Sequence, residues 1–156
     1  MNPVDRDAPQ PPADGPGQAL FSFVRHWSRR WNAPGDAAAA QQGRHVLATE
    51  AVHALSARGG ATINAVAREV GIDQSGASRL VKDAVAAGHL ELRPSGTDAR
   101  RREVSVTPAG LALLRDARRW QEAVFDHLTE QWTPRQRDEF HRAMRRLVER
   151  SHTLDP

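Results

Sequence analysis

The feature that most constrains this chain is a pair of short amphipathic segments joined by a tight turn. Within residues 63–70, apolar residues fall on one helical face, and Gly71 follows as a turn residue. Asp73 supplies an N-cap for a second helix over residues 74–87, which Gly88 terminates. Two helices this close in sequence, with glycine in the turn between them, predict a helix–turn–helix.

The hydrophobic period changes after this pair. Residues 89–93 and 103–107 each alternate apolar and polar positions, and a turn-forming cluster at 94–99 lies between them. Two alternating segments joined by such a cluster predict a β-hairpin.

Helices are also expected on both sides of this centre. Upstream, apolar residues recur at helical spacing over 18–31 and again over 45–57, and the segment between them is either a linker or an Ala-rich extra turn. Downstream, Thr-Pro pairs at 107–108 and 133–134 signal the starts of two helices, because Thr is a good cap and Pro suits the first helical position. The predicted fold is mainly α with a small β-hairpin wing, that is, a winged helix–turn–helix between N- and C-terminal helices.

Composition excludes several classes of function. The chain has no Cys, which rules out a disulfide scaffold, a thiol nucleophile, a thiol redox switch and cysteine-ligated zinc. The seven His include no i, i+4 pair on one helix, so no metal site or cofactor is expected. Phosphate-binding loops and nucleophile-elbow motifs are absent from the sequence, and so are membrane-spanning runs and a signal peptide. We therefore expect a cytoplasmic protein that is not an enzyme and has no membrane partner.

The second helix of the pair carries a polar stripe opposite its apolar one. Hydroxyl, guanidinium and ammonium groups share that stripe, and an amide side chain stands at its start. These groups read base edges or hold phosphates in the major groove of double-stranded DNA. The expected DNA-binding residues of this helix are Gln74, Ser75, Gly76, Ser78, Arg79 and Lys82. The alternative is that this stripe is an ordinary helix face that contacts only solvent.

Three consecutive arginines, Arg100 to Arg102, follow the hairpin turn. Arginine at a projecting hairpin tip suits a narrow, electronegative minor groove. The alternative is a solvated loop. The net charge of +3 is too small to decide between them.

These segments together resemble the MarR (multiple antibiotic resistance regulator) family. The residues that carry the resemblance are Ile63-x-x-Val66-Ala67-x-x-Val70-Gly71-Ile72, Ser75-Gly76-Ala77-Ser78-Arg79-Leu80-Val81, Gly88-x-Leu90 and the wing segment Asp98-x-Arg100-x-x-x-Val104-x-Val106-Thr107-x-x-Gly110.

The resemblance implies a homodimeric transcriptional regulator that binds a palindromic operator. It implies that the polar stripe faces the major groove, that Asp98 and Arg100 shape the wing, and that Arg100 or Arg101 reaches the minor groove. The implied organisation is a disordered Pro-rich tail at 1–17, an N-terminal dimerisation helix and linker at 18–44, a winged helix–turn–helix DNA-binding region at 45–107, and C-terminal dimerisation helices at 108–152.

A small-molecule effector is a further expectation. Trp27 and Trp31 could line an aromatic-ligand pocket, with His53 or Trp120 nearby, although the same residues could simply pack in a core. Two other classes of function stay open: an architectural DNA binder without an operator, and a winged helix that binds an acidic protein.

Overall fold

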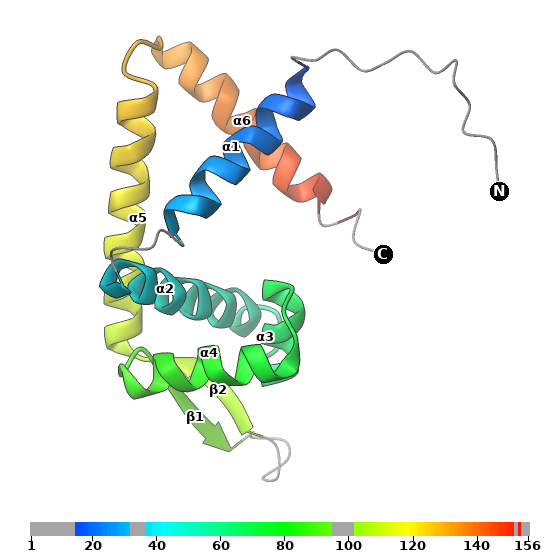
Figure 1. Ribbon diagram of the computed structural model, residues 1–156, viewed down its shortest axis with the longest axis vertical. Helices are drawn as coiled ribbons and strands as arrows, with labels where there is room; N and C mark the ends of the chain where they lie inside the picture. Colours follow the sequence, from blue (N-terminus) through cyan, green and yellow to red (C-terminus); the bar gives the residue numbers. More distant parts are fainter. Residues whose placement is uncertain (1–14, 32–36, 95–101, 152, 154–156) are drawn as a thin grey trace, which may run out of the picture.

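The computed structural model describes residues 15–31, 37–94, 102–151 and 153. Its elements, in chain order, are α1 Pro16–Trp31, α2 Ala37–Ser56, α3 Ile63–Val70, α4 Gln74–Ala86, β1 Leu90–Pro94, β2 Arg102–Val106, α5 Pro108–Leu128 and α6 Pro134–Ser151 (Figure 1). The predicted fold class is confirmed, since helices surround one antiparallel hairpin.

The hydrophobic core lies in the lower half of the molecule, between α2, α3, α4 and the hairpin (Figure 1). Small side chains such as Ala48, Ala77 and Ala84 are fully buried, which lets the helices approach closely. Branched residues fill the remaining space. The core consists of Ala48, Ala51, Val52, Ala61, Val66, Ala67, Ala77, Leu80, Val81, Ala84, Leu90 and Val104.

The hairpin is attached to this core along its inner face. Strand β1 pairs with β2 in a register that sets Leu90 opposite Val106 and Leu92 opposite Val104. The Val104 N–H also donates to the Ala61 carbonyl at 2.8 Å, which ties the loop between α2 and α3 to the wing. Leu90 and Val104 are buried, whereas Leu92 is 40 % exposed because it lies farther along the projecting hairpin.

The hairpin and α5 meet at a junction with almost no free space. A Cβ at Gly110 would lie 2.2 Å from the His89 carbonyl oxygen, so only glycine fits where the first turn of α5 crosses the start of β1. The Thr107 hydroxyl accepts from the Gly110 N–H at 3.0 Å and donates to the Gly88 carbonyl at 2.6 Å. Thr107 therefore both caps the start of α5 and bonds it to Gly88, in the turn that follows α4.

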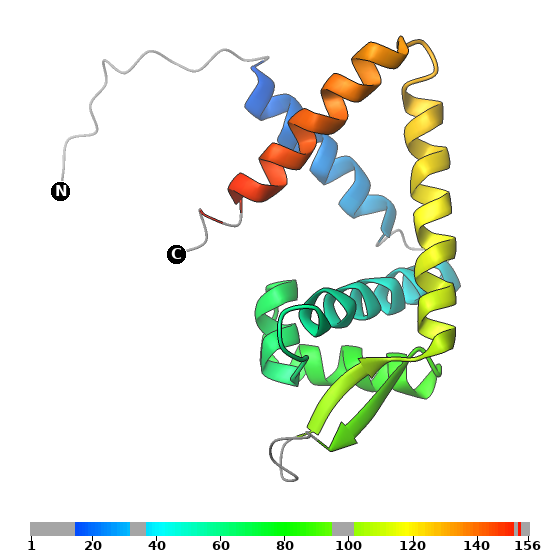
Figure 2. The same ribbon diagram turned by 180° about the vertical axis from the view of Figure 1, so that it is seen from behind.

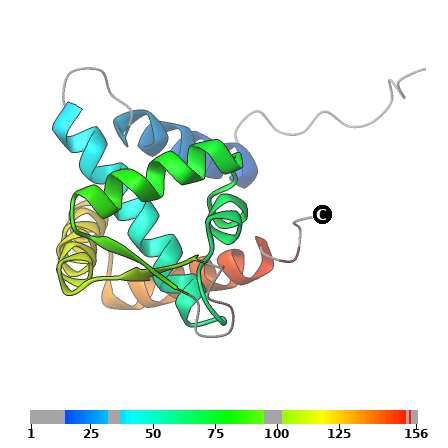
Figure 3. The same cartoon turned by 90° about the horizontal axis from the view of Figure 1, so that it is seen from below.

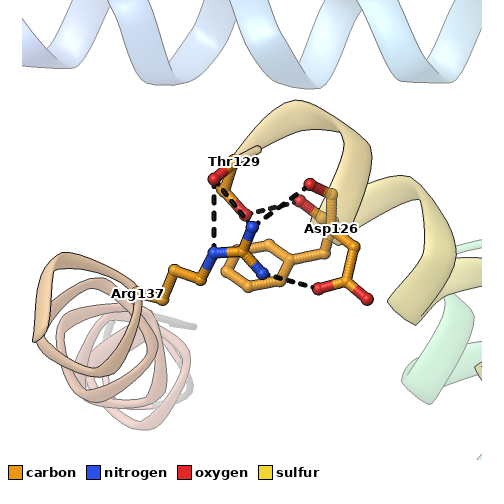
Figure 4. A network of polar contacts seen from close by, with 4 residues as sticks. Asp126, Thr129 and Arg137 are labelled. Atoms are coloured by element: carbon orange, nitrogen blue, oxygen red, sulfur yellow. Dashed lines mark hydrogen bonds and ion pairs between the residues drawn. The ribbon is translucent and has the colours of Figure 1, made fainter. Parts of the chain in front are cut away.

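Helix α5 leaves this junction and rises to a second corner, where α6 turns back (Figures 1 and 2). Arg137 of α6 holds that corner (Figure 4). Its Nη1 pairs with the Asp126 carboxylate at 2.8 Å, while Nε and Nη2 donate to the Thr129 carbonyl at 3.2 and 2.9 Å. A guanidinium with several partners fixes an angle better than a single hydrogen bond does.

Two predicted boundaries were wrong. The Pro-rich tail was expected to reach residue 17, but α1 already begins at Pro16, because proline suits the first helical position and the Ala19 N–H bonds to the Gly15 carbonyl. The second helix was expected at 45–57, but α2 begins at Ala37 and continues across the expected boundary between residues 44 and 45. The Ala- and Gln-rich stretch has high helix propensity, and Gly43 alone does not interrupt it.

The upper part of the molecule leaves apolar side chains uncovered. None of the residues of α6 is buried. Phe140 and Leu147 of α6 are 39 % and 50 % exposed in the single chain. The same holds on α1, where Phe21 is 63 % exposed. Exposed apolar side chains gathered on two helices are typical of an interaction surface.

We predict that Gly110→Ala destabilises the protein by about 1–3 kcal/mol, because the new methyl group would overlap the His89 carbonyl and overpacking has that cost. Urea unfolding of the purified chain measures the loss. Gly17→Ala is the matched control, since no atom lies within 4 Å of the added Cβ there, and it should change the free energy of unfolding by less than ~1 kcal/mol. Equal stability of the two variants would contradict the tight junction.

Candidate nucleic-acid interface

Helix α4 presents its polar stripe to solvent. Gln74, Ser75, Ser78, Arg79 and Lys82 are all exposed. The opposite face of α4 is buried; it comprises Ala77, Leu80, Val81 and Ala84. The division predicted from sequence is therefore present in the fold, and the contact of these residues with DNA stays a prediction.

The start of α4 is held by its cap. The Asp73 carboxylate accepts from the Gly76 N–H at 2.6 Å, which fixes the first turn at the end of the stripe. A Cβ at Gly76 would lie 2.9 Å from Asp73 Oδ1 and 3.6 Å from the Ile72 side chain. Gly76 is half-buried, and its missing side chain makes room for the cap. The predicted contact of Gly76 with DNA stays a prediction.

The preceding turn sets the direction of α4. Gly71 has φ of +74°, in the left-handed region where glycine carries no penalty, and its N–H bonds to the Ala67 carbonyl at 2.9 Å. Helix α3 is capped at its start by Thr62, whose hydroxyl accepts from the Ala65 N–H at 3.2 Å. Both helices of the predicted helix–turn–helix thus have defined ends.

The hairpin lies on the same side of the molecule as α4. Seen from below, α4 and the two strands face the viewer together, and β1 packs against α4 (Figure 3). The two elements therefore form one surface at the end of the molecule away from α1 and α6 (Figures 1 and 2). The predicted wing residues Asp98, Arg100 and Arg101 lie outside the described residues.

Arg93 is a residue of this surface that sequence analysis did not single out. Its side chain is 67 % exposed on β1, and Nη2 pairs with Glu91 at 2.5 Å. The alternation of apolar and polar residues along β1 could have indicated that Arg93 points away from the core. In the observed register Arg93 lies opposite Glu103. The described surface carries charges of both signs, because Asp83 lies on α4 beside Arg79 and Lys82, and Glu91 and Glu103 lie on the hairpin beside Arg93.

A pocket of about 400 Å³ lies far from this surface, where α1, α2 and α5 meet. Trp27 of α1 and Trp120 of α5 line it, with ring centroids 6.1 Å apart and planes inclined by 80°. Its other lining residues are Ala39, Gln42, Gly43, Val46, Asp116 and Ala117. Their shared location could not be predicted from sequence, because the start of α2 was not recognised as helical.

The structure separates the four residues predicted for an effector site. Trp27 and Trp120 come together, whereas His53 is exposed on α2 and does not line the pocket. The side chain of Trp31 lies outside the described part of the chain.

The described residues contain no group of three or more His, Asp or Glu side chains that could hold a metal ion. No helix in that part of the chain is both long and apolar enough to cross a bilayer.

Comparison with known proteins covers both sequence and fold. Residues 43–101 match the model of the MarR family. No curated protein matches the chain. The crystal structure of MarR aligns with a TM-score of 0.65 and 19% identity, and covers 97% of this chain and 96% of its own.

Two further structures align over most of this chain. A mutant of S. aureus MepR bound to an oligodeoxyribonucleotide has a TM-score of 0.56 and 14% identity, and covers 87% of this chain and 98% of its own. Bordetella bronchiseptica BpsR, described for regulation of its DNA binding by 6-hydroxynicotinic acid, has a TM-score of 0.59 and 19% identity, and covers 90% of this chain and 98% of its own. Residues 43–101 therefore resemble the MarR family, and the chain as a whole shares the fold of these solved structures.

Proposed function

We propose that the protein is a sequence-specific repressor that binds a palindromic operator in double-stranded DNA as a homodimer, in the cytoplasm, and carries out no chemistry. The observation that carries this proposal is the exposed polar edge of α4 beside the hairpin (Figure 3). In this proposal Ser78 and Arg79 contact base edges of the major groove, and Lys82 contacts a phosphate. Arg100 or Arg101 would contact the adjacent minor groove, and Asp98 would support that contact, as the resemblance implies.

The N-terminus of α4 supports this orientation. In helix–turn–helix docking the first residues of the recognition helix contact bases, and here Gln74 and Ser75 occupy that position. The positive end of the helix dipole adds attraction for the phosphate backbone. Phosphate contacts supply affinity, which falls as salt rises, and the side chains of α4 supply the choice of sequence.

The uncovered apolar faces support a homodimer. Leu20, Phe21 and Val24 of α1 and Leu147 and Val148 of α6 are between 39 % and 63 % exposed in the single chain. A second copy of the same chain would bury such faces symmetrically, and it would bring a second α4 to the DNA. Two-fold symmetry then predicts half-sites whose centres are about 10 base pairs apart.

The tryptophan pocket supports control by a small aromatic effector. It lies between α1 and α5, which belong to the proposed dimerisation part, and α2, which is packed in the winged-helix core. A ligand there could favour a dimer with a different spacing of its α4 helices. It can shift that equilibrium only by the ratio of its affinities for the two forms.

We expect Arg79→Ala to weaken binding to the preferred site by ~1–3 kcal/mol, and to weaken binding to random duplex much less, because base contacts act only on the cognate sequence. Sites selected by the full chain from a random DNA pool, followed by competition titration, provide the measurement. Arg142→Ala, an exposed arginine on α6, should leave both affinities unchanged. Equal losses on both DNAs would remove Arg79 from base readout, and selection of no consensus would favour an architectural binder.

The wild-type chain should sediment at twice its 17.2 kDa mass. The double variant Phe21→Arg with Leu147→Arg should lose the dimer, because charges placed on the apolar faces must be desolvated in the interface. Leu92→Arg is the control, since Leu92 is also exposed but lies on the wing, and this variant should remain dimeric. A wild-type chain that sediments as a monomer at micromolar concentration would contradict the proposed assembly.

Small aromatic acids, starting with 6-hydroxynicotinic acid, serve as probes of the pocket. An aromatic compound that enters should quench the fluorescence of Trp27 and Trp120 and lower the affinity for DNA. Trp120→Ala should abolish both effects, whereas Trp132→Phe, outside the pocket, should retain them. A quenching ligand that binds Trp120→Ala as tightly as the wild type would place the effector site elsewhere.

A further inference from the structure

Two histidines from distant parts of the sequence meet inside the lower half of the molecule. His45 of α2 is 8 % exposed, and His89 is half-buried in the turn between α4 and β1. Their ring centroids are 5.4 Å apart, with planes inclined by 57°. His45 Nε2 and His89 Nδ1 are both buried, and neither has a hydrogen-bond partner in the described structure. Unsatisfied buried nitrogens of this kind are uncommon and call for an explanation.

His89 occupies the junction that joins the wing to α5. Its N–H donates to the Ala84 carbonyl at 2.9 Å, and its own carbonyl accepts from the Thr107 N–H at 3.1 Å. The same carbonyl excludes any side chain at Gly110. Whatever moves His89 therefore moves the end of α4, the start of β1 and the N-cap of α5 together.

We propose that the contact between His45 and His89, called the joint below, depends on protonation. It holds this junction against α2 while both rings are neutral, and it loosens when His45 takes up a proton. With both rings neutral, their contact is an apolar packing contact between flat surfaces. A proton on His45 places a charge in a site with little water and no acceptor for the new N–H.

The surroundings of His45 favour its neutral form. Burial lowers the pKa of His45 below its ordinary value of 6.5, and positive charge on His89 and on Arg44 of α2 lowers it further; Asp83 of α4 acts in the opposite direction. Because the folded state prefers the neutral ring, the stability from this contact is complete above about pH 6.5 and is lost as the pH falls through the lower pKa of the folded state.

The consequence for regulation rests on the proposed function. The junction sets the position of α4 and the wing relative to α5, and α5 leads to the proposed dimer interface. Loosening of the joint would alter the spacing of the two α4 helices, so mild acidification would weaken operator binding.

The test uses the full chain without DNA, so its outcome is independent of whether the protein is a repressor. Histidine ring signals are followed by NMR from pH 8 to pH 5. Exchange of the Thr107 amide reports on the joint directly, because that amide donates to the His89 carbonyl. We expect His45 to take up its proton below its ordinary pKa of 6.5, and the protection factor of Thr107 to fall several-fold as it does.

His45→Phe keeps a flat ring and removes the proton, so the protection of Thr107 should no longer depend on pH in this variant. If it fails to fold, His45→Gln provides the same measurement. His53→Phe is the matched control and should keep the wild-type response. The proposal is overturned if His45 titrates at or above its ordinary pKa of 6.5, if Thr107 stays equally protected while His45 gains its proton, or if the His45 variant responds to pH as the wild type does.

Discussion

The contact between the His89 carbonyl and the first turn of α5 is the constraint on which the rest of this structure depends. Gly110 permits the approach, and the Thr107 hydroxyl bridges the two segments. This crossing joins the winged helix to the long helix that leads to the upper part of the molecule, and the packing of α2 on α5, with the Arg118–Glu50 ion pair, supports it (Figure 1). A looser crossing would leave the wing with a less defined position relative to α5.

Helix α4 must both pack closely on the core and present a polar face to solvent. Its small buried face, with Ala77 and Ala84 at full burial, lets the helix lie close on α2 and α3. Its other face is thereby free to carry only polar groups, and the Asp73 cap fixes where that face begins. The same partition explains why the core is rich in alanine and valine, because larger side chains would push α4 away from its neighbours.

Local chemistry made the centre of the fold predictable. Thr62, Gly71 and Asp73 set the ends of α3 and α4 through contacts within a few residues, so the sequence alone marked both helices correctly. The Thr107–Pro108 start of α5 was equally local. The start of α2 was missed because an Ala-rich stretch is compatible with a linker as well as with a helix, and only packing against α1 and α5 decides between them.

Features that depend on contacts between distant segments of the chain could not be predicted from the sequence. The sequence around His45 does not indicate that its ring contacts His89. The contact between Trp27 and Trp120 likewise depends on how α1 and α5 are arranged in space. Apolar residues on α1 and α6 recur at helical spacing in the sequence, but the sequence does not show that many of them are exposed in the single chain. The tip of the wing, at residues 95–101, lies outside the described part of the structure.

Hydroxyl-radical footprinting of the purified chain on genomic DNA fragments reports which face of a duplex the protein covers. We expect two protected stretches on one face of the duplex, about one helical turn apart, with flanking protection in the minor groove where the wings would lie. A folded protein that protects no fragment even at low salt would contradict it, and so would protection without any two-fold pattern.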